Sequence, residues 1–586
     1  MSEINRRDFV RWLGAGGVAL AGLRGARAKP ARDKRPNIIV FLTDDQDKHS
    51  LGAYGGKSLT PELDRMAAEG MVFHKAFVTS TVCTPSRYSF LTGRYASRAR
   101  SPRYLAECPP GMQAFPAFNV ALEEDNMNLG AVLSAAGYRT GYTGKFHVGP
   151  ELRVEEQSRE FGLKHTGKDA KDTAEVSEAF RTNELRYREY LKKRGFQWVK
   201  NVYWGNMKKP YSMHNLEWTV AAALEFIEDS KDRPFYLHCC TTLVHGPDKS
   251  WSKSMQQPLV TGAGRGKVPI TPEGMTPRAK ILAELRQAGL DPDKGHAGYR
   301  WVDAGVGAIL RKLKALGIDD NTLVIFTADH GSNMKGSLFD VDGACVPMIA
   351  RWPGGIKAGS HCRQLVQSID IAATAFDLAK ARVPERYVLD GRSLRPLLGG
   401  ATAKGWRDHV YLELGFGRAV RTDDWKYIAV RYTTPQIKAI RSSAPARLPK
   451  LMSPLNRSGI GTRGAKNPNF YGEDQLYHVK RDGLEKRNLA STTAHREQLA
   501  TMRAILLRDL RSIGRPFGEL VPGGNAAKPG QVVQQMELVR RIRIQGKKVT
   551  LPPDVEAGRP PGTGQTKDQR RAGRQKRREQ KRDENP

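Results

Sequence analysis

The chain contains 586 residues, with 95 Lys or Arg and 61 Asp or Glu, which gives a formal net charge of +34. Hydrophobic residues make up 39% of the chain, which is ample for a buried core, and the length suits more than one domain. No run of 18 or more apolar residues occurs, so no segment predicts a permanent transmembrane helix.

The first 28 residues have the pattern of an export signal. Asn5-Arg6-Arg7-Asp8-Phe9 resembles a twin-arginine motif, a Gly/Ala-rich apolar run extends from Leu13 to Leu23, and Ala26-Arg27-Ala28 suits cleavage. An amphipathic helix is the alternative, but the glycines of the run oppose helix formation in water. Because the twin-arginine translocase carries folded proteins, we expect a bacterial protein that folds in the cytoplasm and is exported to the periplasm or beyond.

Residues 37–42 form a continuous apolar run, the pattern of a buried parallel strand, which ends in Thr43-Asp44-Asp45-Gln46. In open α/β sheets, ligand sites lie beyond the carboxyl ends of strands. Two adjacent carboxylates in such a place repel each other unless a cation lies between them. For an isolated Asp pair, an ordinary polar turn is the alternative.

Residues 81–94, Thr-Val-Cys-Thr-Pro-Ser-Arg-Tyr-Ser-Phe-Leu-Thr-Gly-Arg, form the most informative segment. Cys83, Pro85 and Arg87 make a Cys-x-Pro-x-Arg motif, which Leu91-Thr92-Gly93-Arg94 extends. A free cysteine is most often a small buried hydrophobic residue, and the short motif alone would not decide against that interpretation. The extended motif favours a functional cysteine.

Residues 129–136 predict a helix that ends at Gly137, and a short strand follows it. This strand leads to Lys145 and His147, which are two positions apart and would therefore face the same side of a strand. A cation and a proton carrier would then project together. An exposed Lys and an incidental His are the alternative.

Two more apolar strands are predicted further along the chain. Residues 234–244 form the first, which His245-Gly246-Pro247 follows, and His238 in its middle is expected to pack in the core. Residues 321–328 form the second, which ends in Asp329-His330-Gly331, with Lys335 a few positions on. An ordinary polar turn after a core strand is again the alternative.

Taken together, these segments resemble the type I, formylglycine-dependent sulfatases of the alkaline-phosphatase-like superfamily. The resemblance runs from about Arg35 to about Ala490, and residues 150–215 show no motif of the family. It implies an α/β fold in which helices sandwich a large alkaline-phosphatase-like mixed sheet, with a smaller C-terminal α+β domain.

In this family, a maturation enzyme oxidises the motif Cys to Cα-formylglycine, whose hydrate attacks sulfur and whose second hydroxyl then expels sulfate. The resemblance implies that Cys83 is the nucleophile, that Arg87 orients it and that His147 carries its proton. Lys145 and Lys335 would contact the sulfate, and His245 with Lys335 would donate to the leaving alcohol. One divalent cation, expected to be calcium, would be bound by Asp44, Asp45, Asp329, His330 and the modified Cys83. Calcium prefers oxygen ligands, so His330 is either a weak ligand or a hydrogen-bond partner of the transferred group.

The implied function is hydrolysis of sulfate esters by an exported sulfatase, with sulfated carbohydrates as the expected substrates. Phosphonate monoester hydrolases and phosphodiesterases share this site plan and form the first alternative. A polyanion-binding protein with an inactive site is the second, against which the intact Cys83, Arg87, Lys145 and Asp329 argue.

The positive charge is not confined to the two ends of the chain. Residues 1–28 contribute +3 and residues 567–586 contribute +5, which leaves +26 on residues 29–566. A cationic surface attracts polyanions. Nucleic acid is not the expected partner, because no recognition motif for it is found, and we expect a sulfated polysaccharide. A generic basic surface is the alternative.

The expected domains are the signal (1–28), the catalytic domain (35–400), the smaller α+β domain (406–516) and a largely disordered basic tail (517–586). In the smaller domain we expect a hairpin at 418–428, a strand at 474–479 and a helix near 493–512. Residues 433–472 hold seven Lys or Arg and no acid, and their Gly, Pro and Ser predict a long loop that binds an anionic chain or is merely solvated. The six cysteines predict no dense disulfide framework.

Overall fold

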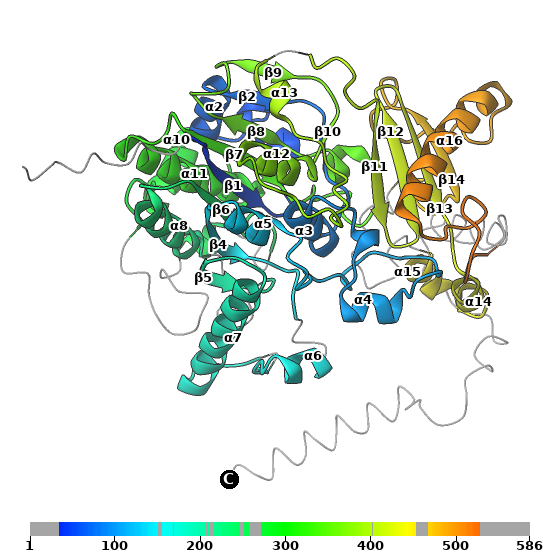
Figure 1. Cartoon of the computed structure of the whole chain (residues 1–586), viewed down its shortest axis with the longest axis horizontal. Coiled ribbons are helices and arrows are strands. Elements are labelled where there is room, and N and C mark those ends of the chain that lie inside the picture. Colours follow the sequence, from blue (N-terminus) through cyan, green and yellow to red (C-terminus); the bar gives the residue numbers. More distant parts are fainter. Residues whose placement is uncertain are drawn as a thin grey trace, which may run out of the picture. The chain divides into compact units, whose positions relative to one another are not determined.

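The computed structural model of the chain describes residues 34–150, 155–167, 169–206, 209–210, 215–246, 251–256, 271–400, 402–452 and 467–527 (Figure 1). The expected export signal and the tail beyond residue 527 lie outside the described residues. Among the residues that are described, no helix is both long and apolar enough to cross a membrane.

The described residues form two compact units. The first takes in the described parts of 1–104, 118–332 and 341–410, and the second takes in those of 105–117, 333–340 and 411–586. The second unit therefore includes two short segments that precede the expected domain boundary near residue 400.

The first unit is built on an eight-stranded mixed sheet with the order β5-β4-β6-β1-β7-β8-β2-β9. Its strands are β1 (Asn37–Thr43), β2 (Met71–Phe73), β4 (Arg139–Lys145), β5 (Trp198–Tyr203), β6 (Phe235–Cys240), β7 (Thr322–Ala328), β8 (Met348–Arg351) and β9 (Ser360–Cys362). In this order, the neighbouring strands β5, β4, β6, β1 and β7 pair in parallel, whereas β8 is antiparallel to both β7 and β2. A small parallel sheet pairs β3 (Ala76–Phe77) with β10 (Val366–Gln367). The predicted large mixed sheet is confirmed.

β1 lies inside the sheet, between β6 and β7, and all seven of its residues are buried. Ile39 pairs with Leu237 of β6 and Val324 of β7, and all three belong to one hydrophobic cluster. Ile38 and Val40, which point to the opposite face, are buried as well. A strand that is covered on both faces needs apolar residues at every position, which explains the uninterrupted run in the sequence.

Helices cover both faces of the sheet (Figure 1). On one face, α2 (Pro61–Ala68), α8 (Leu216–Ser230), α10 (Arg278–Gln287) and α11 (His296–Ala315) contribute to the cluster that contains Ile39. On the other, α3 (Cys83–Thr92), α5 (Leu129–Ala135) and α12 (Asp370–Leu378) pack together. The shorter or peripheral helices are α4 (Pro102–Glu107), α6 (Glu155–Glu160), α7 (Ala174–Lys193), α9 (Trp251–Gln256) and α13 (Arg395–Leu398).

The second unit contains a four-stranded sheet with the order β11-β12-β13-β14. Its strands are β11 (His409–Leu414), β12 (Gly417–Thr422), β13 (Trp425–Val430) and β14 (Asp474–His478). β12 and β13 form the predicted antiparallel hairpin, β14 pairs antiparallel with β13, and α16 (Arg496–Ile513) packs against β12 and β13. The expected smaller α+β fold is confirmed.

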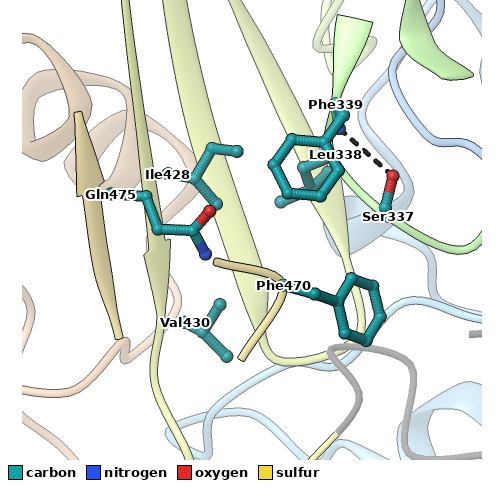
Figure 2. A pocket seen from close by; sticks show the side chains of 7 residues that line it. All are labelled: Ser337, Leu338, Phe339, Ile428, Val430, Phe470 and Gln475. Atoms are coloured by element: carbon teal, nitrogen blue, oxygen red, sulfur yellow. Dashed lines mark hydrogen bonds between the residues drawn. The ribbon is translucent and has the colours of Figure 1, made fainter. Parts of the chain in front are cut away.

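Within this unit, the segment 333–340 packs against the four-stranded sheet. Leu338 and Phe339 line a pocket together with Ile428 and Val430 of β13 (Figure 2). Ser337, Phe470 and Gln475 complete its lining. The segment that carries Lys335 is thus held to β13 by apolar contacts.

The basic stretch 433–472 is not the continuous loop that its composition predicts. Its first half forms α14 (Thr434–Arg441), a 3₁₀ turn (Pro445–Arg447) and α15 (Leu448–Leu451). Thr433 caps α14 by accepting a hydrogen bond from the Gln436 N–H, at 3.2 Å, and α14 buries Ile437 and Ile440. The loop prediction was wrong for these residues because a cap and a buried apolar pair outweigh the Pro residues. Residues 453–466 lie outside the described part of the chain.

Candidate active site

Five of the sequence-predicted site residues of the first unit lie at or beyond the carboxyl ends of four neighbouring strands. Asp44 and Asp45 follow β1, Lys145 ends β4, Asp329 follows β7, and His245 lies five residues after the end of β6. Because β4, β6, β1 and β7 are adjacent and parallel, these strand ends meet at one edge of the sheet.

Backbone hydrogen bonds extend the parallel ladder past the strands and fix these residues. The Asp44 N–H donates to the Leu243 carbonyl at 2.9 Å, and the Val244 N–H donates to the Asp44 carbonyl at 2.8 Å. The Asp329 N–H donates to the Thr43 carbonyl at 3.0 Å. The two acidic loops and the turn before His245 are therefore held by the same interactions that form the sheet.

Cys83 is the first residue of α3, a helix whose ten residues are all buried. Its Sγ lies 3.3 Å from His330 Nε2, 3.6 Å from Asp44 Oδ1 and 3.8 Å from Lys145 Nζ. The N-terminus of α3, which carries the partial positive charge of the helix dipole, is thus located at Cys83. Cys83 lies among charged and imidazole side chains and not in an apolar core.

Arg87 lies one helical turn after Cys83 and links two of the acids. Its Nε donates to Asp329 Oδ2 at 2.9 Å, and its Nη2 donates to Asp44 Oδ2 at 3.0 Å. Burial alone would lower the pKa of Arg87, but the charges of Asp329 and Asp44 raise it well above its ordinary value. The buried guanidinium therefore stays charged and holds both carboxylates in place.

The acidic residues of the site fit a bound cation. Asp44, Asp45 and Asp329 are at most 5% exposed, and Asp329 Oδ1 accepts no hydrogen bond from any described residue. Burial and the nearby Asp44 charge raise the pKa of Asp329 despite the charges of Arg87 and Lys145, so its ionised form is only partly compensated. A divalent cation would provide that compensation.

Two groups of side chains in this site have ligand atoms close enough to share a metal ion. One consists of Asp44, Cys83, Asp329 and His330, and the other of Asp44, Asp45 and His245, with all ligand atoms of each group within 4.8 Å of one another. Carboxylates supply two of the four ligand atoms in the first group and two of the three in the second, and hard divalent cations prefer such oxygen ligands.

Both ring nitrogens of His330 lie near acidic side chains. Nδ1 lies 3.0 Å from the Gly331 carbonyl oxygen and 3.3 Å from Asp45 Oδ1, whereas Nε2 faces Cys83 and lies 3.5 Å from Asp329 Oδ1. Oxygen acceptors lie near both nitrogens, but the two at Nδ1 are the nearer ones and favour the proton there. With the proton on Nδ1, the lone pair of Nε2 faces Cys83 and Asp329, which suits a metal ligand.

Asn206 is a polar residue of the site that the sequence analysis did not identify. Its Oδ1 lies 3.5 Å from Lys145 Nζ, and its Nδ2 lies 3.1 Å from His245 Nδ1. His245 Nε2 in turn lies 3.7 Å from Asp45 Oδ2. Asn206 lies three residues after β5, whose Lys200 and Asn201 interrupt the apolar pattern, so the sequence offered no strand-end signal for it.

The strand-periodicity argument for His147 does not hold. β4 ends at Lys145, and His147 has a φ of 52°, which is outside the extended region where alternate residues share a face. The His147 ring packs edge-on against Trp204, with the ring centroids 4.2 Å apart, and lies 5.9 Å from the Phe118 ring.

Lys335 is buried and belongs to the segment 333–340 of the second unit, whereas the other predicted site residues belong to the first. Its assignment to the site therefore rests on its place in the motif alone.

The prediction that His238 packs in the core is confirmed. The residue lies in the middle of β6. The residue is 1% exposed, its Nδ1 lies 2.7 Å from the Tyr236 hydroxyl, and burial lowers its pKa to about 3. The neighbouring Cys239 and Cys240 are also buried, and no disulfide joins any of the six cysteines, all of which lie in the described residues.

A further group of titratable side chains connects the loop after β1 to the loop after β7. Asp47 accepts a hydrogen bond from the Ser332 N–H at 2.7 Å, and His49 Nδ1 lies 3.0 Å from Asp342 Oδ1. Burial and the Asp342 charge raise the pKa of Asp47 to about 6. Its bond to Ser332 ties together the two loops that carry the acidic residues of the site.

Comparisons with known protein families agree with this architecture. A family model described as Sulfatase matches residues 36–381, and one described as N-sulphoglucosamine sulphohydrolase, C-terminal, matches residues 329–436. The chain is 26% identical over 507 residues to an ulvan-active sulfatase of Formosa agariphila, an alignment that covers 84% of this chain and 82% of the relative.

Solved structures show the same fold. One is a protein in complex with its substrate D-glucosamine-2-N,6-O-disulfate, with a TM-score of 0.51 and 19% identity over 82% of this chain and 98% of that one. Another is the phosphonate monoester hydrolase of Agrobacterium radiobacter, with a TM-score of 0.50 and 18% identity over 82% of this chain and 96% of that one.

Proposed function

Because the chain belongs to the sulfatase family of the alkaline-phosphatase-like superfamily and is a sulfate ester hydrolase, we propose that it acts on sulfated carbohydrates through a formylglycine at position 83. The observation that carries this proposal is the position of Cys83. Its Sγ lies 3.3–3.8 Å from His330, Asp44 and Lys145 at the N-terminus of α3. Anionic groups bind favourably at such a helix end.

Once oxidised by a maturation enzyme, residue 83 would supply a hydrated aldehyde as the nucleophile, with a second hydroxyl available to expel sulfate. Arg87 keeps Asp44 and Asp329 fixed beside this residue through its two charge-assisted hydrogen bonds. His147 is the residue proposed to move the proton of the hydrate when sulfate leaves.

Charge on the sulfate oxygens would be neutralised from several sides. A divalent cation held by Asp44, Asp45, Asp329 and His330 would supply positive charge there, and the oxygen-rich ligand set favours calcium. Lys145 Nζ, 3.8 Å from Cys83 Sγ, is placed to bind a sulfate oxygen. Lys335 is proposed as a second basic contact, on the strength of the motif that contains it.

The leaving alcohol of a sugar sulfate is a poor leaving group and needs a donor at its oxygen. His245, with Lys335, is proposed for this role. The turn that contains His245 is tied to Asp44 by the Val244 N–H, which supports a fixed place at the edge of the site.

The substrate class rests on charge and on the relatives. Residues 29–566 carry a net charge of +26, which would draw a polyanion towards the enzyme. The Formosa relative is named for ulvan, and one similar structure holds a disulfated glucosamine. Export by the twin-arginine translocase to the periplasm or the medium, where such polymers occur, is supported by the motif at Asn5-Arg6-Arg7.

Hydrolysis of phosphonate monoesters or phosphodiesters is the second candidate function. The similarity of fold to the phosphonate monoester hydrolase of Agrobacterium radiobacter favours it. Both reactions use a nucleophile, a cation and basic side chains around a tetrahedral centre, so the proposed residues would serve either.

Substrates with the same leaving group distinguish the two functions. We would co-express the chain with a maturation enzyme and measure kcat/KM on 4-nitrophenyl sulfate, a 4-nitrophenyl phosphonate and bis-4-nitrophenyl phosphate, followed by a panel of sulfated saccharides. We expect the sulfate to be preferred and Cys83→Ala to remove all activity. Faster turnover of the phosphonate or the diester, or activity that survives in Cys83→Ala, would contradict the proposal.

A further inference from the structure

Asn206 connects two residues of the proposed mechanism. It lies three positions after the end of β5 and is half-buried, with Lys145 on one side of its amide and His245 on the other. Neither the motifs of the sequence nor the proposed roles account for it. The role of Asn206 follows from which atoms of Lys145, Asn206 and His245 can donate a hydrogen bond and which can accept one.

Lys145 determines how the amide of Asn206 is oriented. An ammonium group has three N–H donors and no acceptor, so the amide atom that faces it must be the oxygen. Asn206 Oδ1 is the atom found there, 3.5 Å from Lys145 Nζ. A flipped amide would put its own N–H groups against the ammonium, which is unfavourable.

The fixed amide then determines the proton position on His245. Asn206 Nδ2, which can only donate, lies 3.1 Å from His245 Nδ1. This contact favours Nδ1 as the acceptor, which places the N–H of neutral His245 on Nε2. The Gly246 carbonyl oxygen, 2.9 Å from Nδ1, offers the competing arrangement, in which Nδ1–H donates to Gly246 and Nε2 carries no proton.

We propose that Asn206 is a positioning residue that keeps the His245 N–H on Nε2, through an amide orientation that Lys145 imposes. This inference rests on the proposed function, in which His245 serves the leaving alcohol as a donor. A hydrogen on Nε2 is what the neutral ring needs in order to donate a hydrogen bond to the leaving oxygen. Without Asn206, the Gly246 carbonyl would draw the proton to Nδ1.

Steady-state kinetics of Asn206→Ala and Asn206→Leu on two substrates test the consequence for catalysis. Leu keeps most of the volume of Asn without its hydrogen bonds. We expect kcat/KM on a sugar sulfate to fall by roughly 10- to 100-fold in both variants, at or below the lower end of what one proton-transfer group contributes, because His245 itself is still present. An activated aryl sulfate needs little help at its leaving oxygen and should be hydrolysed almost as before.

Comparison with His245→Ala separates a failure of this inference from a failure of the proposed function. In the His245→Ala background, Asn206→Ala should cause no further loss on the sugar sulfate. If His245→Ala harms the sugar and aryl sulfates equally, the donor role of His245 is wrong. If only the sugar sulfate suffers from His245→Ala but Asn206→Ala harms both substrates or neither, the positioning role of Asn206 alone is wrong.

The tautomer itself can be observed by ¹⁵N NMR of enzyme labelled in histidine, with the His245 signals assigned by their loss in His245→Ala. We expect Nε2–H in the wild type and Nδ1–H in Asn206→Ala. Nδ1–H in the wild type would overturn the inference. Asn201→Ala is the matched control, because Asn201 lies in β5 and donates to the Trp218 carbonyl at 2.6 Å. It should lower stability without altering the ratio of the two substrates.

Discussion

At the scale of single residues, Cys83 differs from the other cysteines near the sheet. Cys239 and Cys240 lie inside β6, and burial raises the pKa of both thiols. Cys83 instead contacts a Lys, an Asp and a His at the first turn of a helix. Buried cysteines in apolar surroundings are inert, whereas a polar, electropositive environment suits a residue that takes part in chemistry.

Removing one acid of the cluster should remove the metal ion. Asp329→Asn deletes the charge of a carboxylate whose Oδ1 has no hydrogen-bond donor among the described residues, while Arg87 still has an oxygen to bind. We expect the metal content to fall, as elemental analysis would show, and kcat to drop by roughly 10²-fold or more, the scale of losing a key electrostatic stabiliser.

Asp303→Asn is a matched control for that substitution. Asp303 is buried in α11, where it accepts from the Leu63 N–H at 2.8 Å, and burial raises its pKa to about 7. Asn keeps an oxygen for the Leu63 N–H but loses the ion pair with Arg300, so some stability should be lost while metal content and kcat are retained. Full metal content in Asp329→Asn, or full activity after exhaustive chelation, would count against the cation site.

The sequence predicted the acids of the site because each follows an apolar strand, and the strand ends meet. It could not predict Asn206, because a single polar residue after a strand is common and only the fold brings it between Lys145 and His245. The argument for His147 failed for a local reason. The backbone leaves the extended conformation directly after Lys145, and periodicity says nothing about a residue beyond that point.

At the scale of elements, a buried charge cluster in the second unit anchors the segment that carries Lys335. Lys426 of β13 lies 2.5 Å from Asp340 and 2.8 Å from Glu485, and the Asp340 N–H donates to Glu485 at 2.6 Å. Arg421 of β12 contacts the other oxygen of Asp340 at 3.1 Å. The cluster reinforces the apolar contacts seen in Figure 2.

Lys426→Met should loosen this anchor. It leaves Asp340 and Glu485 buried without their shared cation, a change that costs about 3–5 kcal/mol of unfolding free energy. If the cluster serves to position Lys335, kcat/KM on sulfate esters should fall as well. In the Lys335→Ala background, Lys426→Met should lower stability but cause no further loss of kcat/KM.

Denaturant unfolding and kinetics of the four proteins in this cycle check the prediction. Lys480→Met is the control, because Lys480 forms a solvent-exposed ion pair with Asp424 in the same unit. It should change neither stability nor activity appreciably. If the activation free energies lost in the two single variants add in the double variant, the cluster stabilises the fold without acting through Lys335.

The elements of the second unit were predicted with mixed success, for identifiable reasons. The β12–β13 hairpin and α16 have strong local patterns and were found. α14 was not, because its cap at Thr433 and its buried pair Ile437 and Ile440 lie in a stretch that Pro and basic residues dominate. Whether α14 forms depends on its packing against the rest of the unit, which cannot be predicted from composition.

At the scale of the whole molecule, the positive charge is the property that best indicates the substrate. Lys438 and Arg441 are exposed on α14, and Arg447 is exposed at the turn that follows. The residues between these cations include no acid. Such a surface attracts a polyanionic chain.

Neutralising Lys438, Arg441 and Arg447 to Gln should raise KM for a sulfated polysaccharide. It should also weaken the dependence of that KM on salt, because screened contacts are being removed. A small aryl sulfate, which cannot extend beyond the site, should be hydrolysed as before. Kinetics at several salt concentrations measure both effects.

Equal removal of charge elsewhere is the control for this experiment. Arg496, Arg508 and Arg511 are exposed on α16 and can be changed to Gln in the same way. If both triple variants respond alike, net charge alone attracts the polymer. If neither responds, the basic surface of α14 does not bind the substrate.

The central claim is that this chain cleaves sulfate esters with a formylglycine at position 83, and mass spectrometry of the peptide that contains this residue tests it most directly. Active enzyme should yield a peptide in which one oxygen replaces the sulfur and two hydrogens of Cys83. A fully active preparation in which Cys83 remains unmodified would contradict the account.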